Sequence, residues 1–415
     1  MTNQRLYPGW LIVIGGFLIM ATCYSVFVNC FNLFLIPITK SLMISRMQFS
    51  VNSSIAAIIG VFASLFIGKL VDRYDARLIG SLCVLLTVLD MVGWGFITAI
   101  WQMYILSIVT GLCVVSGSRL LISILITNWF HEKSGLALSL ALSGSGVGGT
   151  AMSLIISSLI TTQGWRMAFF MSALITFLLA FPLSLLAFRT RPSAIDLKLY
   201  HSAKKPSRLG EPNQPDNNVP HPTTSHARKP IIWLLIICFL FTGLINGGII
   251  VNISANFVDA GYSFKYAADI VSLEMFILIF AKIILGFLYD RYGVLIGTLV
   301  GSLTTLFAIL SLIFARLPIA PYLFALSFGF GTCLGTVAPP LLIVHIFGSK
   351  SSAHLIGYVT AAEMFGVAIG AVLMGHSFDK TGSYTFGWII LLIICFLMTL
   401  LFIQSIRLAR STIKA

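Results

Sequence analysis

Twelve apolar runs follow one another along this chain of 415 residues, and each is near the ~20 residues that a helix needs to cross a bilayer. The composition agrees, because 58% hydrophobic and 9% charged residues leave too much apolar surface for one water-soluble core. We therefore predict an all-α membrane protein with twelve transmembrane helices, at residues 10–34, 49–71, 78–99, 102–128, 135–161, 166–188, 231–257, 267–289, 294–316, 319–347, 353–378 and 384–407.

One long polar segment separates the first six runs from the last six. It is rich in Pro, Asn, His, Lys and Arg without helical periodicity, which is typical of a mobile tether. We expect an N-terminal six-helix bundle at residues 1–188, a cytoplasmic linker at 189–230 and a C-terminal six-helix bundle at 231–415.

The basic residues predict the orientation. With both termini and the linker cytoplasmic, most Lys and Arg residues lie on that side, and the other side receives only Lys40, Arg46, Arg166, Lys265, Arg316 and Lys380. A basic cytoplasmic face against anionic lipid explains the net charge of +13 without a nucleic acid as partner. The compact loops favour the plasma membrane of a prokaryote, which is its inner membrane. The N-terminus lacks a cleavage site typical of a signal peptide, so we expect the first run to be retained.

A polar hairpin between the second and third runs recurs in the second half of the chain. Its Gly-x-x-x-Asp-Arg-Tyr pattern begins at Gly68 and again at Gly286, 218 residues later. The same offset relates Gly111 to Gly329, Gly148 to Gly366 and Gly164 to Gly382. We infer two homologous halves.

Two six-helix halves with this hairpin in each resemble the major facilitator superfamily. The resemblance implies alternating access, in which contacts made by the hairpins break and re-form, and it implies a protein that often works as a monomer. The expected gating residues are Gly68, Asp72, Arg73, Arg77, Gly286, Asp290 and Arg291. Alternatively, these charges only anchor cytoplasmic loops.

A second set of motifs is more specific. The run Asn128–Ala137 is followed by Ser143–Gly148, with Pro8-Gly9-Trp10, Gly164-Trp165-Arg166 and Asp379–Tyr384 elsewhere in the chain. In this order they resemble the monocarboxylate transporter and oxalate/formate antiporter branch of the superfamily. The spacings Gly144-x-x-x-Gly148, Gly331-x-x-x-Gly335 and Gly366-x-x-x-Gly370 indicate close helix packing. No Gly-Lys-Ser/Thr follows the glycines, which argues against a phosphate-binding loop.

Ionisable residues inside transmembrane helices are costly unless they face a cavity or a partner. This chain has Asp90, Arg119, Glu274, Lys282 and Glu363 in its apolar runs, and His345 near the end of one. Lys282 lies where the resembled branch typically carries an arginine that binds substrate carboxylate. A lysine keeps that charge but loses the bidentate fork. Alternatively it forms a salt bridge, with a partner on another helix, because Glu274 is eight residues earlier, about 12 Å along the helix.

Arg119 would supply a second positive group from the other half, or else pair with Asp90, which we expect to be structural. Glu363 lies where oxalate-type antiporters carry a substrate-binding lysine. Its negative charge therefore argues against oxalate as the substrate. An unmatched buried carboxyl is best neutralised by a proton. Glu363 and Glu274 are therefore the candidate proton carriers. Among the uncharged polar residues, the candidates for hydrogen bonds to substrate are Asn29, Asn246 and Tyr358, which could equally join helices.

These residues predict secondary active transport of a small organic anion, most simply proton-coupled symport of a monocarboxylate. Two alternatives stay open: a carboxylate/carboxylate antiporter, and an exporter of drugs or zwitterionic metabolites. A receptor that signals through the linker is disfavoured because the linker is short. The sequence contains no nucleophile constellation, metal-ligand cluster or nucleotide loop, so we expect no enzymatic activity, metal or cofactor.

Overall fold

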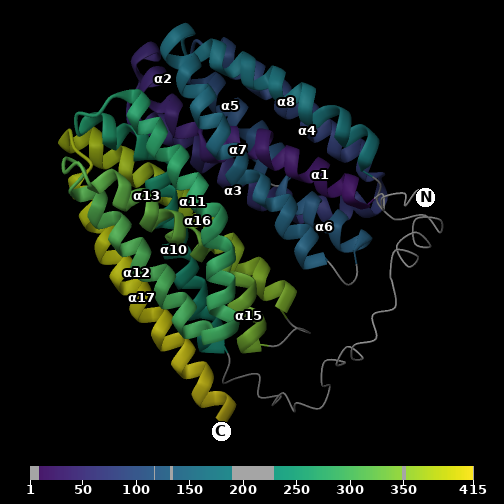
Figure 1. The fold of residues 1–415 in the computed structure, drawn as a ribbon, viewed down its shortest axis with the longest axis vertical. Coiled ribbons are helices and arrows are strands. Elements are labelled where there is room, and N and C mark those ends of the chain that lie inside the picture. Colours follow the sequence, from purple (N-terminus) through teal and green to yellow (C-terminus); the bar gives the residue numbers. More distant parts are fainter. Residues whose placement is uncertain (1–8, 116, 131–133, 189–228, 348–351, 415) are drawn as a thin grey trace, which may run out of the picture.

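The computed structural model describes residues 9–115, 117–130, 134–188, 229–347 and 352–414, and every regular element among them is helical. We call the described residues up to Phe188 the N-terminal half and those from Lys229 onward the C-terminal half. Figure 1 shows the two halves as adjacent bundles of long helices. The predicted linker lies almost entirely outside the described residues, so the proposed domain boundaries stay a prediction.

The N-terminal half combines α-helices with short segments of π and 3-10 helix. Its elements are α1 (Gly9–Ile19), the π-helical η1 (Met20–Asn29), the 3-10 turn η2 (Phe31–Phe34), α2 (Leu35–Leu42), α3 (Arg46–Arg73), α4 (Ala76–Phe96), α5 (Ile100–Thr110), the π-helical η3 (Gly111–Val115), α6 (Arg119–Trp129), α7 (Ser134–Gln163) and α8 (Trp165–Ala187).

The C-terminal half repeats this plan with fewer interruptions. Its helices are α10 (Lys229–Asp259), α11 (Phe264–Tyr292), α12 (Val294–Ile313), α13 (Ala320–Gly331), α14 (Cys333–Thr336), α15 (Ala338–Phe347), α16 (Ser352–Thr381) and α17 (Thr385–Lys414).

The number of spans agrees with the sequence. Within the described residues, eleven helices are long and apolar enough to cross a membrane, and the number is twelve if the bent pair Ala320–Thr336 and Ala338–Phe347 forms one span. The pair bends by 45° beside Pro339 and Pro340, because a proline inside a helix removes a backbone hydrogen bond and crowds the preceding turn. The first membrane-length span is Gly9–Asn29, and the chain continues beyond it in a shorter apolar helix, Phe31–Leu42, that extends past the predicted end at residue 34.

The fourth span is interrupted at the same place in the repeat as the tenth. The π-helical η3 ends at Val115, and α6 begins at Arg119, so this charge lies at the start of a helix in the middle of a span. Gly117 is required here, because a Cβ at this position would overlap the carbonyl oxygen of Cys113. Breaks of this kind inside a membrane are tolerated where the freed backbone groups are buried in protein.

Glycines bring the helices of each half into backbone contact, as their spacing predicts. A Cβ at Gly148 on α7 would overlap the carbonyl oxygen of Ala21 in the first span, and a Cβ at Gly366 on α16 would overlap that of Leu240 on α10. Gly148 and Gly366 are related by the 218-residue offset, so the two halves use equivalent close contacts.

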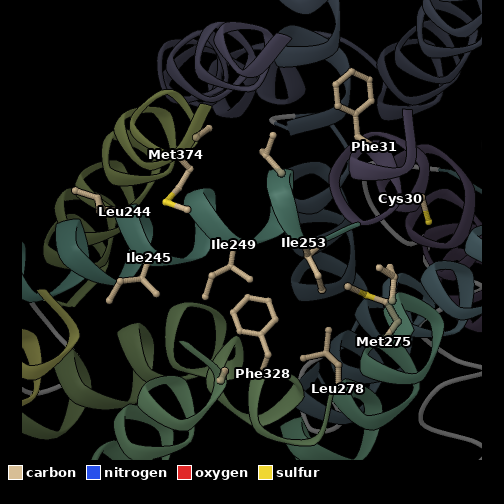
Figure 2. Close-up of a cluster of buried hydrophobic side chains, with 14 of the residues drawn as sticks. Cys30, Phe31, Leu244, Ile245, Ile249, Ile253, Met275, Leu278, Phe328 and Met374 are labelled. Atoms are coloured by element: carbon tan, nitrogen blue, oxygen red, sulfur yellow. The ribbon is translucent and has the colours of Figure 1, made fainter. Parts of the chain in front are cut away.

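An apolar cluster joins the two halves. In Figure 2, Ile249 and Ile253 of α10 point towards Phe328, Leu278 and Met275, with Cys30 and Phe31 of the N-terminal half beside them. Along α10 these isoleucines lie between Asn246 and Asp259. The polar candidate on α10, Asn246, is thus separated from one end of the bundle by packed apolar side chains.

Candidate functional site

Ser145 on α7 links two of the spans that carry candidate residues. Its carbonyl oxygen accepts hydrogen bonds from Asn29 Nδ2 at 2.8 Å and from Ser25 Oγ at 3.0 Å. Its hydroxyl lies 3.5 Å from the ammonium of Lys282, which is on α11 in the other half. The predicted substrate residues Asn29 and Lys282 are therefore brought together, through a serine that sequence reasoning did not single out.

Glu363 on α16 lies on the other side of the same interface between the halves. It is buried, and a Cβ at Gly335 would meet both its Oε1 and the Nδ2 of Asn246. Glu363 is also within electrostatic range of Arg119, which belongs to the N-terminal half. Tyr24 of the first span is close enough to interact with both charges. The structure therefore places Glu363 beside Asn246 and within electrostatic range of Arg119, without an ion pair between the two charges in the described part of the chain.

Glu274 is the second buried carboxyl of the group. Its side chain is 1% exposed, and its Oε1 is buried without a hydrogen-bond partner among the described residues. It attracts Lys282, eight residues along α11, without an ion pair between them in the described part of the chain. Lys282 also repels Arg119, so both cations act on one region between the halves.

Three other candidates lie elsewhere. Asp90 accepts a hydrogen bond from Thr110 Oγ1 at 2.6 Å, which favours the structural role expected of it. His345 is exposed on α15. Tyr358 is 62% exposed on α16, on the same exposed stripe as Phe365 and Ile369, and so lies outside the buried group; its role in binding stays a prediction.

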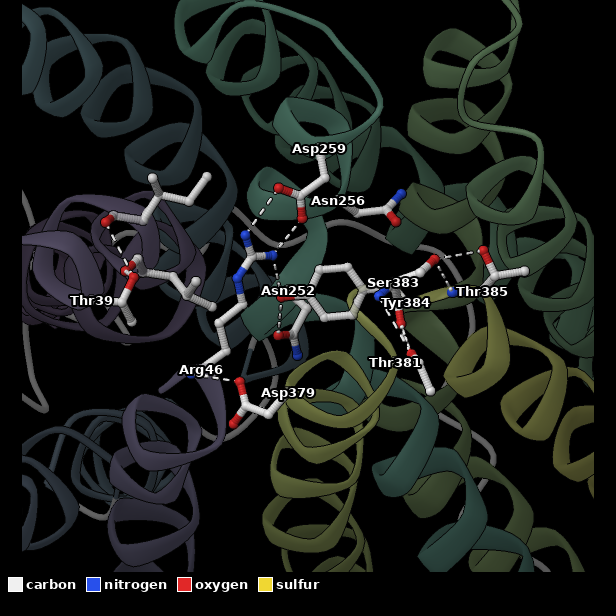
Figure 3. Close-up of polar contacts among 12 residues, drawn as sticks. Thr39, Arg46, Asn252, Asn256, Asp259, Asp379, Thr381, Ser383, Tyr384 and Thr385 are labelled. Carbon is white, nitrogen blue, oxygen red and sulfur yellow. Dashed lines mark hydrogen bonds and ion pairs between the residues drawn. The ribbon is translucent and has the colours of Figure 1, made fainter. Parts of the chain in front are cut away.

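The halves are fastened together at the end remote from Phe188 and Lys229, which we call the far end. Arg46, the first residue of α3, donates from Nη2 to Asp259 Oδ1 at 2.9 Å and from Nη1 to Asp259 Oδ2. Its guanidinium lies over the ring of Phe378, 3.6 Å from the centroid. Asp379 accepts from the backbone N–H groups of Arg46 and Met47 at 3.1 and 2.9 Å. Figure 3 shows these contacts converging on Arg46.

Tyr384 completes the far-end contacts. Its hydroxyl accepts from Arg46 Nη1 at 3.0 Å and donates to Asn252 Oδ1 at 3.0 Å (Figure 3). Burial raises the pKa of Tyr384, which keeps the hydroxyl protonated and able to donate. Asn256 accepts from Trp388 Nε1 at 2.9 Å. Asn252 and Asn256 thus join helices of the C-terminal half.

The predicted gating residues lie at the opposite end, near Phe188. Arg77 donates from Nε to the Phe188 carbonyl at 3.2 Å, within its own half. Arg73 and Arg291 are exposed. Arg73 lies near the ring of the adjacent Tyr74, and Arg291 lies near the ring of Phe287, one helical turn earlier. A Cβ at Gly286 would meet no described atom within 4 Å. The side chains of Asp72 and Asp290, like the surroundings of Gly68, lie outside what the structure describes, so the gating roles stay predictions.

Sequence reasoning missed Ser145, Tyr24 and Arg46. Ser145 lies in the Ser143–Gly148 run, whose glycines indicated helix packing and not a role for this serine, and Tyr24 is an ordinary polar residue in an apolar run. Arg46 stands at the start of a span and is indistinguishable in sequence from an interfacial anchor. Its partner Asp259 lies 213 residues away, so only the folded chain shows the pair.

The chain belongs to the Major Facilitator Superfamily, whose family profile matches residues 17–331 and 235–414. It is a transporter of this superfamily, a multi-pass integral membrane protein and not an enzyme. The fold agrees: the nucleoside transporter NupG superposes with a TM-score of 0.71 at 12% identity, covering 97% of this chain and 99% of that one. A bacterial homolog of the human lysosomal transporter Spinster, in an inward-facing and unoccupied conformation, superposes with a TM-score of 0.68 at 14% identity, covering 99% and 98%.

Relatives similar in sequence include monocarboxylate transporters. Monocarboxylate transporter 13 of Bos taurus is 24% identical over 390 residues, which is 92% of this chain and 85% of the relative. Monocarboxylate transporter 12 of Homo sapiens is 24% identical over 408 residues, or 91% and 76%. The MFS transporter asaE of Aspergillus flavus is 25% identical over 401 residues, or 92% and 84%.

Proposed function

We propose that this transporter carries a small organic anion, most simply a monocarboxylate, together with a proton. The observation that carries the proposal is the electrostatic attraction between Arg119 and Glu363 from opposite halves, in a region where Arg119 also repels Lys282. Two cations supply the attraction that a carboxylate needs in a low-dielectric site. The relatives named as monocarboxylate transporters support the same substrate class.

The roles follow from the charges. With both carboxylates ionised, Glu363 and Glu274 balance Arg119 and Lys282, so the substrate-free site carries no net charge. A monocarboxylate would leave one excess negative charge, and a proton would remove it. Because a charged site is costly to move through the membrane interior, substrate and proton travel together. Glu363 is the preferred proton carrier, because it faces a cation across the interface that must open; Glu274 is the alternative.

In this proposal the contacts of Arg46 hold the far end closed while the site is reached from the end near Phe188. Breaking them, and forming new contacts among the hairpin residues, would expose the site to the other side. Both termini are cytoplasmic in this scheme, in the inner membrane of a prokaryote, and one chain is a complete transporter.

The test is uptake of radiolabelled lactate into proteoliposomes, with and without an inward proton gradient, and with pyruvate, formate and oxalate as competitors. We expect the gradient to accelerate uptake, and pyruvate to compete better than oxalate. Uptake that needs a counter-substrate inside and ignores the gradient would indicate an antiporter. Failure of every carboxylate to enter or compete would overturn the anion proposal and point to a cationic or zwitterionic substrate.

A further inference from the structure

Residues 145 and 363 occupy the same position in the two halves of the chain. They are 218 residues apart, the offset that also relates Gly148 to Gly366. Each lies three residues before its glycine, and each glycine packs on a backbone carbonyl of the first helix of its own half. The α7 and α16 helices are thus held in equivalent positions, so the side chains of Ser145 and Glu363 occupy equivalent places in the two halves.

The surroundings of the two positions correspond as well. Ser145 lies 3.5 Å from Lys282, a cation of the C-terminal half, and Glu363 attracts Arg119, a cation of the N-terminal half. Asn29 donates to the Ser145 carbonyl, while Asn246 lies beside the Glu363 carboxyl. Positions 145 and 363 therefore each face a cation of the other half, but only position 363 carries an acidic side chain.

We infer that Ser145 is a substrate-positioning residue, the neutral counterpart of Glu363, and that this asymmetry limits coupling to one proton per anion. The inference rests on the proposed function. A hydroxyl at position 145 leaves Lys282 free to bind the substrate carboxylate. The carboxylate at position 363 occupies Arg119 until one proton neutralises it. With acids at both equivalent positions, neither cation would be free without protonation, whereas with an acid at neither position Glu274 alone would be left to carry a proton.

The experiment moves the acid from one half to the other. Ser145→Asp alone places a carboxylate within reach of Lys282, and we expect lactate uptake to fall about tenfold through competition for that charge. Glu363→Gln alone should remove the acceleration of lactate uptake by the proton gradient. The double variant Ser145→Asp/Glu363→Gln again has one acid at one of the two positions, and we expect it to regain gradient-driven uptake.

The matched control is Ser143→Asp/Glu363→Gln, which puts the acid two residues away on α7, on another face of the helix. Gradient dependence regained equally by this control, or not regained by the Ser145→Asp double variant while it still exchanges lactate, would overturn the inference. Proton uptake by the unmodified transporter gives a second readout, from a pH-sensitive dye: one proton per lactate is expected, and two would overturn it. If the unmodified transporter ignores the gradient, the proposed function itself has failed, which is a separate outcome.

Discussion

Arg46 and Asp259 form a two-pronged ion pair between α3 and α10, and so between the two halves of the transporter. The Arg46 side chain is 15% exposed and that of Asp259 33%, so solvent screens the pair only in part. Tyr384 and Phe378 hold the guanidinium from the other sides. Because the pair crosses the interface that alternating access must open, its strength contributes to the balance between the two conformations.

We predict that Arg46→Gln shifts this balance towards opening of the far end. An ion pair of this exposure contributes about 1 kcal/mol, which corresponds to roughly a fivefold change in the equilibrium. Spin labels placed at the far end of each half, with the distances between them measured by pulsed electron paramagnetic resonance, would detect the molecules in which the far end is open. Arg316→Gln, which changes another exposed arginine outside the pair, is the control. An unchanged distance distribution in Arg46→Gln would show that the apolar cluster alone keeps the far end closed.

Lys282 is predicted to contribute its charge, not a specific geometry. Lys282→Ala removes a charge-assisted contact to the substrate carboxylate, and we expect the KM for lactate to rise about tenfold or more. Lys282→Arg keeps the charge and should retain uptake, with KM changed less than in the alanine variant. Initial uptake rates over a range of lactate concentrations check both values. Equal loss in both variants would mean that Lys282 acts through its contact with Ser145.

Variants of the two buried acids, Glu363 and Glu274, should behave differently in an assay of proton coupling. Glu363→Gln is expected to abolish acceleration of lactate uptake by the proton gradient, whereas Glu274→Gln should retain it, because Glu363 attracts a cation across the interface and Glu274 attracts Lys282 on its own helix. Asp90→Asn is the matched control: it neutralises a third buried acid, whose hydrogen bond from Thr110 an amide oxygen can still accept. If Glu274→Gln loses the gradient effect and Glu363→Gln keeps it, the proton carrier is Glu274.

Helix packing in the C-terminal half gives a prediction about stability. Gly366→Ala adds a methyl group where α16 touches the Leu240 carbonyl, so the helices must separate, at a cost of about 1–3 kcal/mol. Gly357→Ala is the control on the same helix, because its Cβ would meet no described atom within 4 Å. Thermal unfolding in detergent should show a lower Tm for Gly366→Ala alone. Equal Tm values would mean that α16 can shift without loss of packing.

Much of the fold was determined by the sequence itself. The length and apolarity of each run predict a span. Lipid offers no hydrogen bonds to the backbone, so an apolar run that crosses it must pair its own N–H and C=O groups, which a helix does. The bend beside Pro339 and Pro340 and the close contacts at Gly148 and Gly366 also followed from local residue properties. The interruption of the fourth span at Arg119 did not, because a π-helical turn depends on how neighbouring helices pack against it.

For the candidate site, the sequence determined which residues are unusual, and the tertiary structure decided which of them meet. Arg119 could have paired with Asp90 on the neighbouring span, but Asp90 binds Thr110 and the carboxyl that attracts Arg119 is Glu363. Helical periodicity fixes the faces of one helix relative to each other, but not its rotation against a helix two hundred residues away. That rotation is set by packing of the whole bundle, which is why Ser145 and the pair of Arg46 with Asp259 emerged only from the fold.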